Sequence, residues 1–213
     1  MNVKLGLGAI SLALSLNAMA VTMDSFKDDH HPWSMIGGLG YAWYKFGYDS
    51  DGQTSIGRFA IGRDIGTFKS LNVGLELGYQ TGNQMRLDIS QTTLDKLGGL
   101  PIQTTIKPML DLLISAKTAT LTNIPVFGIA KIGVAYRRLE VNDQETVNDL
   151  SEAACEIQAG FGYGISNRAS LALLYQGIFN GNTDFTVNTA NNTGHISNIP
   201  NQNGVLLTLS YKV

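Results

Sequence analysis

The chain has 213 residues, of which 44 % are hydrophobic, with 15 basic residues against 17 acidic ones and a single cysteine, Cys155. Nucleic-acid binding needs a basic cluster, so this balance leads us to expect no nucleic-acid partner. One cysteine cannot form an internal disulfide, so the fold must be held without one. After residue 20, no apolar run approaches the ~18 residues of a transmembrane helix, which excludes helical spans.

The N-terminal residues have the pattern of an export signal. Lys4 gives a positive start, residues 5–16 form an apolar stretch interrupted only by small residues, and Ala18-Met19-Ala20 fits the small-x-small cleavage pattern. Such a stretch is too short to span a membrane as a helix. We predict a signal peptide over residues 1–20, a periplasmic segment over 21–33 and one domain over 34–213.

The first two predicted strands cover residues 34–48 and 53–65. The first is rich in glycine and aromatic residues, which leaves the assignment of its two faces open. In the second, Phe59 and Ile61 oppose Arg58 and Gly62. A side-chain period of two indicates a strand with one apolar and one mostly polar face.

The alternation is clearest in residues 70–82 and recurs, less cleanly, in 109–120 and 125–138. In the first of these, the apolar face consists of Leu71, Val73, Leu75, Leu77 and Tyr79, with polar residues and glycines between them. A 3.6-residue period does not fit, and each glycine would cost a helix about 1 kcal/mol relative to alanine. We therefore predict strands.

Three further strands complete the pattern, over residues 153–165, over 169–180 and at the C-terminus. In the last, alternate positions are apolar up to the end of the chain: Val205, Leu207, Leu209, Tyr211 and Val213. A chain that stops within a strand is expected of a sheet that its last strand closes.

Eight strand segments separated by alternating connections predict a closed barrel. The connections after the second, fourth and sixth segments are short, beginning with a turn around Gly66-Thr67, and those after the third, fifth and seventh are long. Transmembrane barrels have short turns on one side and longer loops on the other. We predict an all-β, closed, antiparallel up-and-down transmembrane β-barrel of eight strands.

A soluble barrel of the lipocalin type is the structural alternative, with the apolar face inside. Two features favour the membrane barrel. The polar face is rich in glycine, which suits a narrow interior, and the apolar face carries aromatic residues near strand ends, as membrane-interface girdles do.

The chain also resembles a known family, the OmpA/OmpX-like eight-stranded outer-membrane barrels of Gram-negative bacteria. The most specific parts are the paired-strand stretch from Gly160 to Leu171 and the alternating C-terminal strand. The resemblance implies location in the cell outer membrane, contact with its lipid and lipopolysaccharide, and recognition of the last strand by the barrel-assembly machinery. Family members usually end in an aromatic residue, whereas this chain ends in Val213, with Tyr211 two positions earlier.

Charged residues fall on the predicted inward face and form the candidate functional site. They are Arg58, Glu76, Asp111, Lys117, Lys131, Arg137 and Glu156. Burying single charges is costly, so they should pair or stay hydrated. The candidate pairs are Lys131 with Glu76 and Arg137 with Glu156. One interpretation is a static polar core, and the other is a gate in which a cation exchanges carboxylate partners.

Two patterns raise the question of catalysis or metal binding. His195-Ile196-Ser197 has the His-x-Ser spacing of lipid A deacylases, but its Asn-, Gly- and Pro-containing surroundings predict a loop. Asp28-Asp29-His30-His31 has metal-ligand residue types in adjacent positions near a terminus, where they are more often solvated. We expect no catalytic residue, no metal and no cofactor.

Any binding specificity should lie in the long connections, residues 83–108 and 181–203. In the first, Leu94, Leu97 and Leu100 could pack a short helix over the barrel mouth. The hypothesis is a non-enzymatic outer-membrane protein with a structural or adhesin-like role and a host or envelope ligand. The alternatives are a small ion-permeable pore with a charge-gated lumen and, less favoured, a lipid A-modifying enzyme.

Overall fold

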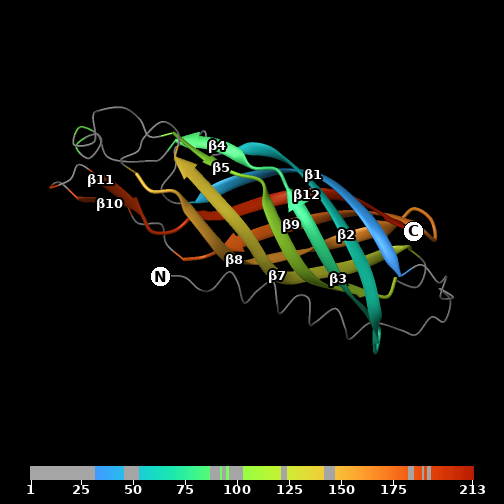
Figure 1. Cartoon of the computed structure of the whole chain (residues 1–213). Coiled ribbons are helices and arrows are strands. Elements are labelled where there is room, and N and C mark those ends of the chain that lie inside the picture. Colours follow the sequence, from blue (N-terminus) through green and yellow to red (C-terminus); the bar gives the residue numbers. More distant parts are fainter. Residues whose placement is uncertain are drawn as a thin grey trace.

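The computed structural model describes residues 32–45, 53–86, 92, 95, 103–120, 124–141, 147–181, 185–188, 190 and 193–213. Eight long strands form the wall of a barrel (Figure 1): β1 Trp33–Lys45, β2 Thr54–Phe68, β3 Leu71–Gln80, β6 Met109–Thr118, β7 Val126–Val141, β8 Leu150–Gly164, β9 Ala169–Phe179 and β12 Asn201–Lys212. Four short strands are β4 Asn83–Arg86, β5 Gln103–Ile106, β10 Phe185–Asn188 and β11 Thr193–Ile196. None of the described residues forms a helix long and apolar enough to cross a membrane.

The wall is closed because the first and last long strands pair with each other. β1 and β12 are antiparallel, with Leu39 opposite Leu207. Every other long strand is antiparallel to its neighbours along the chain, and β7 pairs with both β6 and β8. This confirms the predicted eight-stranded, closed, up-and-down barrel.

One predicted turn is misplaced. Gly66-Thr67 belongs to β2, which continues to Phe68, and the chain reverses at Lys69 and Ser70. Lys69 has a φ of 56°, the left-handed conformation that a two-residue hairpin turn requires and that glycine usually supplies. A shift of register between Asp64 and Gly66 marks a bulge just before this turn.

The long connections contain strands that the sequence does not predict. β4 and β5 form a hairpin, and β5 pairs with the far end of β7, with Ile106 opposite Leu139. The wall on that side is thereby extended beyond the barrel rim. β10 and β11 form a second hairpin inside the tract expected to be an irregular loop. The short helix predicted through Leu94, Leu97 and Leu100 lies outside the described residues.

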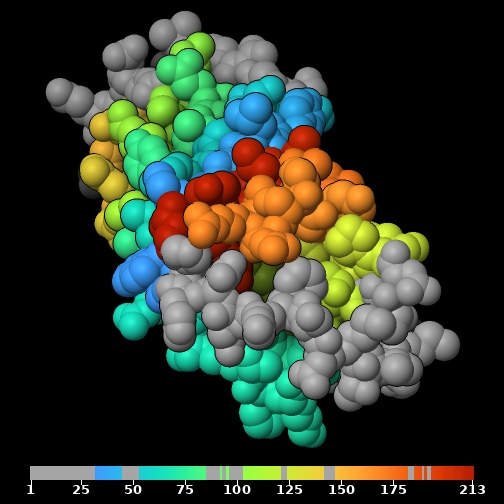
Figure 2. Space-filling view, turned by 90° about the vertical axis from the view of Figure 1, so that its right-hand side faces the viewer, coloured from blue at the N-terminus to red at the C-terminus, as the bar shows by residue number. Residues whose placement is uncertain are grey.

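The outer surface of the barrel is an apolar belt. Large side chains on every long strand are exposed there, including Leu39 at 75 %, Leu77, Leu112, Ile132 and Leu207. β1, β12 and β9 lie side by side on one part of this surface (Figure 2). The faces of β1 are also settled, since Trp33, Met35 and Tyr41 point outward. In water so large an apolar surface would be unfavourable, whereas in a bilayer it contacts lipid.

The interior is filled by side chains of mixed polarity. One buried apolar cluster joins residues of β1, β2, β7, β9 and β12: Ala42, Ile56, Ile129, Ala172, Leu174 and Leu206. A second joins Met109, Ala135, Ala154 and Ile178. Buried charged and amide side chains occupy the remaining inward positions. A barrel of eight strands has just enough room for its own side chains.

The apolar belt makes Leu77 a test of the assigned faces. Leu77 points outward between Ile61 on β2 and Leu112 on β6. We expect Leu77→Arg to destabilise the refolded barrel by about 2–4 kcal/mol, because it puts a charge into the hydrocarbon layer. Urea unfolding in lipid vesicles measures this, with Leu77→Ala as the control that removes the leucine without adding a charge. Equal stability of the two variants would contradict the lipid-facing assignment.

Candidate functional site

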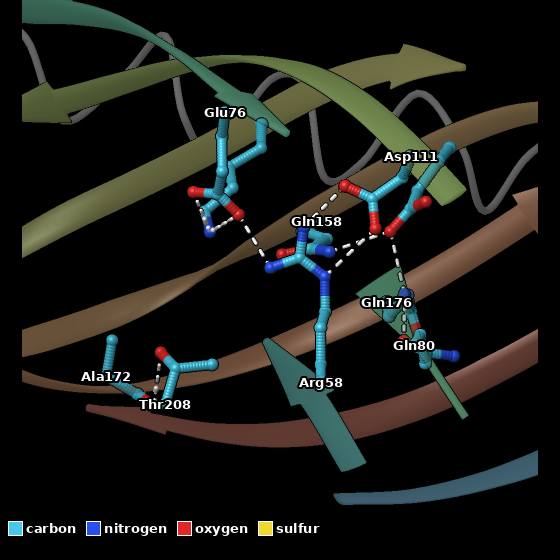
Figure 3. A network of polar contacts seen from close by, with 10 residues as sticks. Arg58, Glu76, Gln80, Asp111, Gln158, Ala172, Gln176 and Thr208 are labelled. Carbon is cyan, nitrogen blue, oxygen red and sulfur yellow. Dashed lines mark hydrogen bonds and ion pairs between the residues drawn. The ribbon is translucent and has the colours of Figure 1, made fainter. Parts of the chain in front are cut away.

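Four charged side chains from four adjacent strands meet inside the barrel (Figure 3). Arg58 on β2 lies between two carboxylates: its Nη1 donates to Glu76 Oε1 on β3 at 2.6 Å, and its Nε and Nη2 donate to the two Asp111 oxygens on β6 at 3.1 and 2.5 Å. Two parallel bonds from one guanidinium to one carboxylate hold both groups in a fixed orientation.

Lys131 on β7 completes this group, which we call the lumen ion network. Its Nζ donates to both carboxylate oxygens of Glu76, at 2.9 and 2.8 Å. Glu76 therefore bridges two cations, Arg58 and Lys131. All four residues of the network are at most 4 % exposed. Removing any one of them would leave the network with an unbalanced buried charge, so its members should depend on one another for stability.

Glu156 on β8 lies beside the network and is held by amides rather than by a cation. Its Oε1 accepts hydrogen bonds from Gln158 Nε2 and Gln176 Nε2, each at 2.7 Å. Gln176 Nε2 also donates to Gln80 Oε1 at 2.9 Å, so the amides link β3, β8 and β9 across the interior.

The candidate pair of Arg137 with Glu156 is wrong. Arg137 instead contacts Glu152, with Nη2 donating to Oε1 at 2.6 Å. The reason is strand register, since Glu152 stands directly opposite Arg137 whereas Glu156 stands opposite Gly133. Four residues along a strand correspond to about 13 Å. Glu152 was missed because the alternation in the sequence places it just outside the predicted strand 153–165.

Arg137 and Glu152 hold the chain that leads into β12 over the barrel mouth. Arg137 Nη1 donates to the Pro200 carbonyl at 2.9 Å, and Nη2 also donates to the Ile199 carbonyl at 3.2 Å. Glu152 Oε2 accepts from the Ile199 backbone N–H at 3.1 Å and from Asn180 Nδ2 at 2.6 Å. A buried ion pair thus fixes the backbone of residues 199–200.

Apolar residues from the ends of long strands and from separate connections pack above this ion pair and form what we call the mouth cluster. Its buried members are Ile106, Leu139, Val141, Val147, Ile196 and Ile199, with Tyr44, Leu150 and Phe185 packed against them. Asn148 joins two of the connections, because its side chain accepts from the Ile196 N–H at 2.8 Å and donates to the Ile196 carbonyl at 3.2 Å. Described residues of two connections therefore pack against the strand ends above the ion pair.

The remaining candidate residues lie apart from the network. Lys117 is half-buried nearer the turn end of β6, opposite Asn72 on β3 and Ile129 on β7. His195 belongs to β11 and not to a loop, and both it and Ser197 are exposed in the mouth region rather than on a lipid-facing strand. Asp28-Asp29-His30-His31 lies outside the described residues.

The alternate residues of the C-terminal strand all point outward: Val205, Leu207, Leu209, Tyr211 and Val213.

A glycine makes room for the ion network. Gly78 stands opposite Asp111 on the inward face, and a methyl group there would overlap Arg58 Nη2 and both carboxylate oxygens of Asp111. Gly37, on the outward face of β1, has open space where its methyl group would be. Close packing therefore explains the glycine at position 78 and does not explain the one at position 37.

We expect Gly78→Ala to destabilise the barrel by about 1–3 kcal/mol, because the added methyl forces the Arg58–Asp111 pair apart in a filled interior. Gly37→Ala is the matched control and should change the free energy of unfolding little. Urea unfolding in vesicles, followed by tryptophan fluorescence, measures both. If the two alanine variants were equally stable, the tight packing around Gly78 would be refuted.

Comparison with known proteins adds the fold relationship. No family model matches the sequence, and no curated protein is similar to it. Among solved structures, the chain is similar to outer membrane protein OprG from Pseudomonas aeruginosa (11 % identity, 85 % of this chain and 95 % of that chain covered, TM-score 0.53). It is also similar to Neisserial surface protein A, with 13 % identity, 85 % of this chain and 97 % of that chain covered, and a TM-score of 0.51. A third similar structure is Ail, the attachment invasion locus protein of Yersinia pestis, in complex with the heparin analogue sucrose octasulfate, with 11 % identity, 85 % of this chain and 97 % of that chain covered, and a TM-score of 0.50.

These likenesses confirm, at the level of the fold, the resemblance to OmpA/OmpX-like barrels that the sequence shows. The chain has the fold of the eight-stranded outer-membrane β-barrels. At identities near a tenth, fold is what such likeness establishes, and function has to be argued from the site.

Proposed function

We propose that this chain is an exported, non-enzymatic outer-membrane protein whose role is structural or surface-interacting, and that its barrel does not conduct ions. The observation that carries the proposal is the combination of an apolar outer belt with a filled interior. The belt fits insertion into a bilayer, and the filled interior leaves the connections at the mouth as the surface for binding.

The filling of the interior favours a plug over a pore at two separate levels. In the barrel, the lumen ion network and the apolar cluster around Leu174 and Leu206 occupy the inward positions. At the mouth, the Arg137–Glu152 pair and the mouth cluster hold the connections together. An ion would have to displace both, which supports a static core over a gate.

The position of His195 and Ser197 favours a binding role over the lipid A-modifying alternative. A lipid A deacylase would need these groups to face lipid, and here both are exposed on the mouth side, His195 within β11 of the β10–β11 hairpin and Ser197 just after it. The proposed ligand is a host or envelope component that contacts residues 83–108 and 181–203. Ail is in complex with a heparin analogue in its structure; at the mouth of this chain the ammonium of Lys107 is already paired with the carboxylate of Glu140.

The turn end of the barrel supports contact with lipid head groups. Arg63 lies over the Trp33 ring at 5.2 Å, and Lys212 pairs with Asp64 at 3.4 Å. Cations beside aromatic rings are typical of the membrane interface. At the mouth end, the surrounding lipid would be lipopolysaccharide. The outward alternation of β12 is the feature that the barrel-assembly machinery would recognise.

Location and orientation are tested together. We expect the protein in the outer-membrane fraction, migrating faster on gels before heating than after it, because the closed barrel stays folded in detergent. An epitope tag at Ala190, in the connection between β10 and β11, should be cleaved by protease on intact cells. The control is a tag at Asn167, in the β8–β9 turn, which should be protected. Cleavage of the Asn167 tag with protection of the Ala190 tag would reverse the orientation.

Planar-bilayer recording separates the plug from the pore. We expect the refolded barrel to give no current above that of bare lipid, because the interior is filled. Lys131→Ala and Arg137→Ala should also give no current, since each leaves the other level of filling in place. A porin reconstituted in the same bilayer shows that channels are detectable. Single-channel steps in the wild type, raised by either alanine variant, would support the gated pore instead.

A further inference from the structure

We propose that Glu156 is a proton-binding site inside the barrel, where the protonated carboxyl forms a two-bond acid–amide pair with Gln158. In this state Gln158 Nε2–H donates to Glu156 Oε1, and Glu156 Oε2–H donates to Gln158 Oε1. When the proton leaves, the second bond is lost and the interior gains one negative charge.

Two buried acceptor atoms point to this proton. Glu156 Oε1 accepts two hydrogen bonds, whereas Glu156 Oε2 and Gln158 Oε1 have no partner among the described residues. Both side chains are fully buried. A buried polar atom without a hydrogen bond is unfavourable, and here both unpartnered atoms are acceptors, so only a donor can satisfy them.

One proton would satisfy both atoms at once. Glu156 and Gln158 are two residues apart on β8 and therefore share one face of the strand, and the 2.7 Å bond from Gln158 Nε2 already places the amide against the carboxyl group. A carboxylic acid and an amide joined by one such bond can close a ring through the second. In the proposed state, a hydrogen atom on Glu156 Oε2 closes the ring by donating to Gln158 Oε1, the other unpartnered oxygen.

The charges around Glu156 favour the neutral form. The cations of the lumen ion network, Arg58 and Lys131, bond to Glu76 and Asp111, and Glu156 has amide donors alone. Two buried cations therefore face three buried carboxyl groups. Higher on the same face, Glu152 is balanced by Arg137, and Lys117 lies half-buried toward the turn end. Protonation of Glu156 makes the buried group neutral, whereas ionisation leaves one charge uncompensated.

A bound cation is the other way to balance this charge, and the geometry supports it less. A cation would need several oxygen ligands around it, and two unpartnered oxygens are available here. The amide nitrogen atoms of Gln158 and Gln176 also direct their hydrogens at Glu156 Oε1. A proton requires no additional space in the filled interior.

The test compares the wild type with Glu156→Gln across pH. The glutamine is isosteric with the protonated acid and can make the same two bonds to Gln158, so it mimics the proposed state permanently. At pH values where the folded barrel still binds this proton and the unfolded chain has released it, the equilibrium constant for unfolding of the wild type rises about tenfold per pH unit relative to that of the variant. The sign is fixed: folding takes up a proton, so wild-type stability falls relative to Glu156→Gln as pH rises.

Urea unfolding in vesicles from about pH 5 to about pH 9, followed by the fluorescence of Trp33 and Trp43, gives the two profiles. Infrared spectroscopy of the folded barrel provides a second readout, because a protonated carboxyl has a carbonyl band that a carboxylate lacks. We expect that band in the wild type and not in Glu156→Gln. Glu140→Gln, which removes a half-exposed carboxylate paired with Lys107, should retain both the band and the wild-type pH profile.

Several outcomes would overturn the proposal. Parallel pH profiles with no difference in the infrared band would show that Glu156 stays ionised. Failure of Glu156→Gln to fold, or equal destabilisation at every pH, would show that the fold needs the negative charge. Replacement of sodium by choline at constant ionic strength should leave the wild type unchanged. A sodium-dependent stability that Glu156→Gln abolishes would assign the site to a metal cation.

Discussion

The closed barrel reverses the arrangement of a water-soluble protein, because its apolar side chains face outward and its charged and amide side chains face inward. The rest of the structure follows from this constraint. The outward faces are given to apolar residues such as Leu39 and Leu207, so the interior has to accept the polar ones. An interior of eight strands has no space for bulk water beside its side chains. Every buried charge must therefore find a partner among the neighbouring inward residues, and stability depends on how completely these pairs are formed.

The lumen ion network meets this constraint through one bridging carboxylate. Glu76 binds both Arg58 and Lys131, and Asp111 accepts from Nε and Nη2 of Arg58, so two cations and two anions balance one another. The arrangement depends on Gly78, whose missing side chain leaves the volume that the pair occupies. Glycine on the inward face therefore has a packing function that adds to its tolerance of strand curvature.

The strands could be predicted from the sequence because alternation is a local property, and the partners could not because register is a property of the closed sheet. Leu71 to Tyr79 indicate a strand and its faces with no knowledge of neighbours. The choice between Glu152 and Glu156 for Arg137 depends on where β7 and β8 align, which no local pattern records. The turn at Lys69 and the four-residue strands β5 and β11 were missed because Lys69 is not a glycine and these strands are too short for a period to be visible.

Glu152 and Glu156 show how position alone assigns different chemistry to the same residue type. Both point inward from β8, four residues apart, and both are held by several hydrogen bonds. Glu152 faces a guanidinium, so its charge is matched and it can hold the backbone over the mouth. Glu156 faces amides, with the nearest cations already bonded to other carboxylates. A charge that no cation balances in a filled interior is more stable when a proton neutralises it, so the closed core that argues against conduction also favours a neutral Glu156.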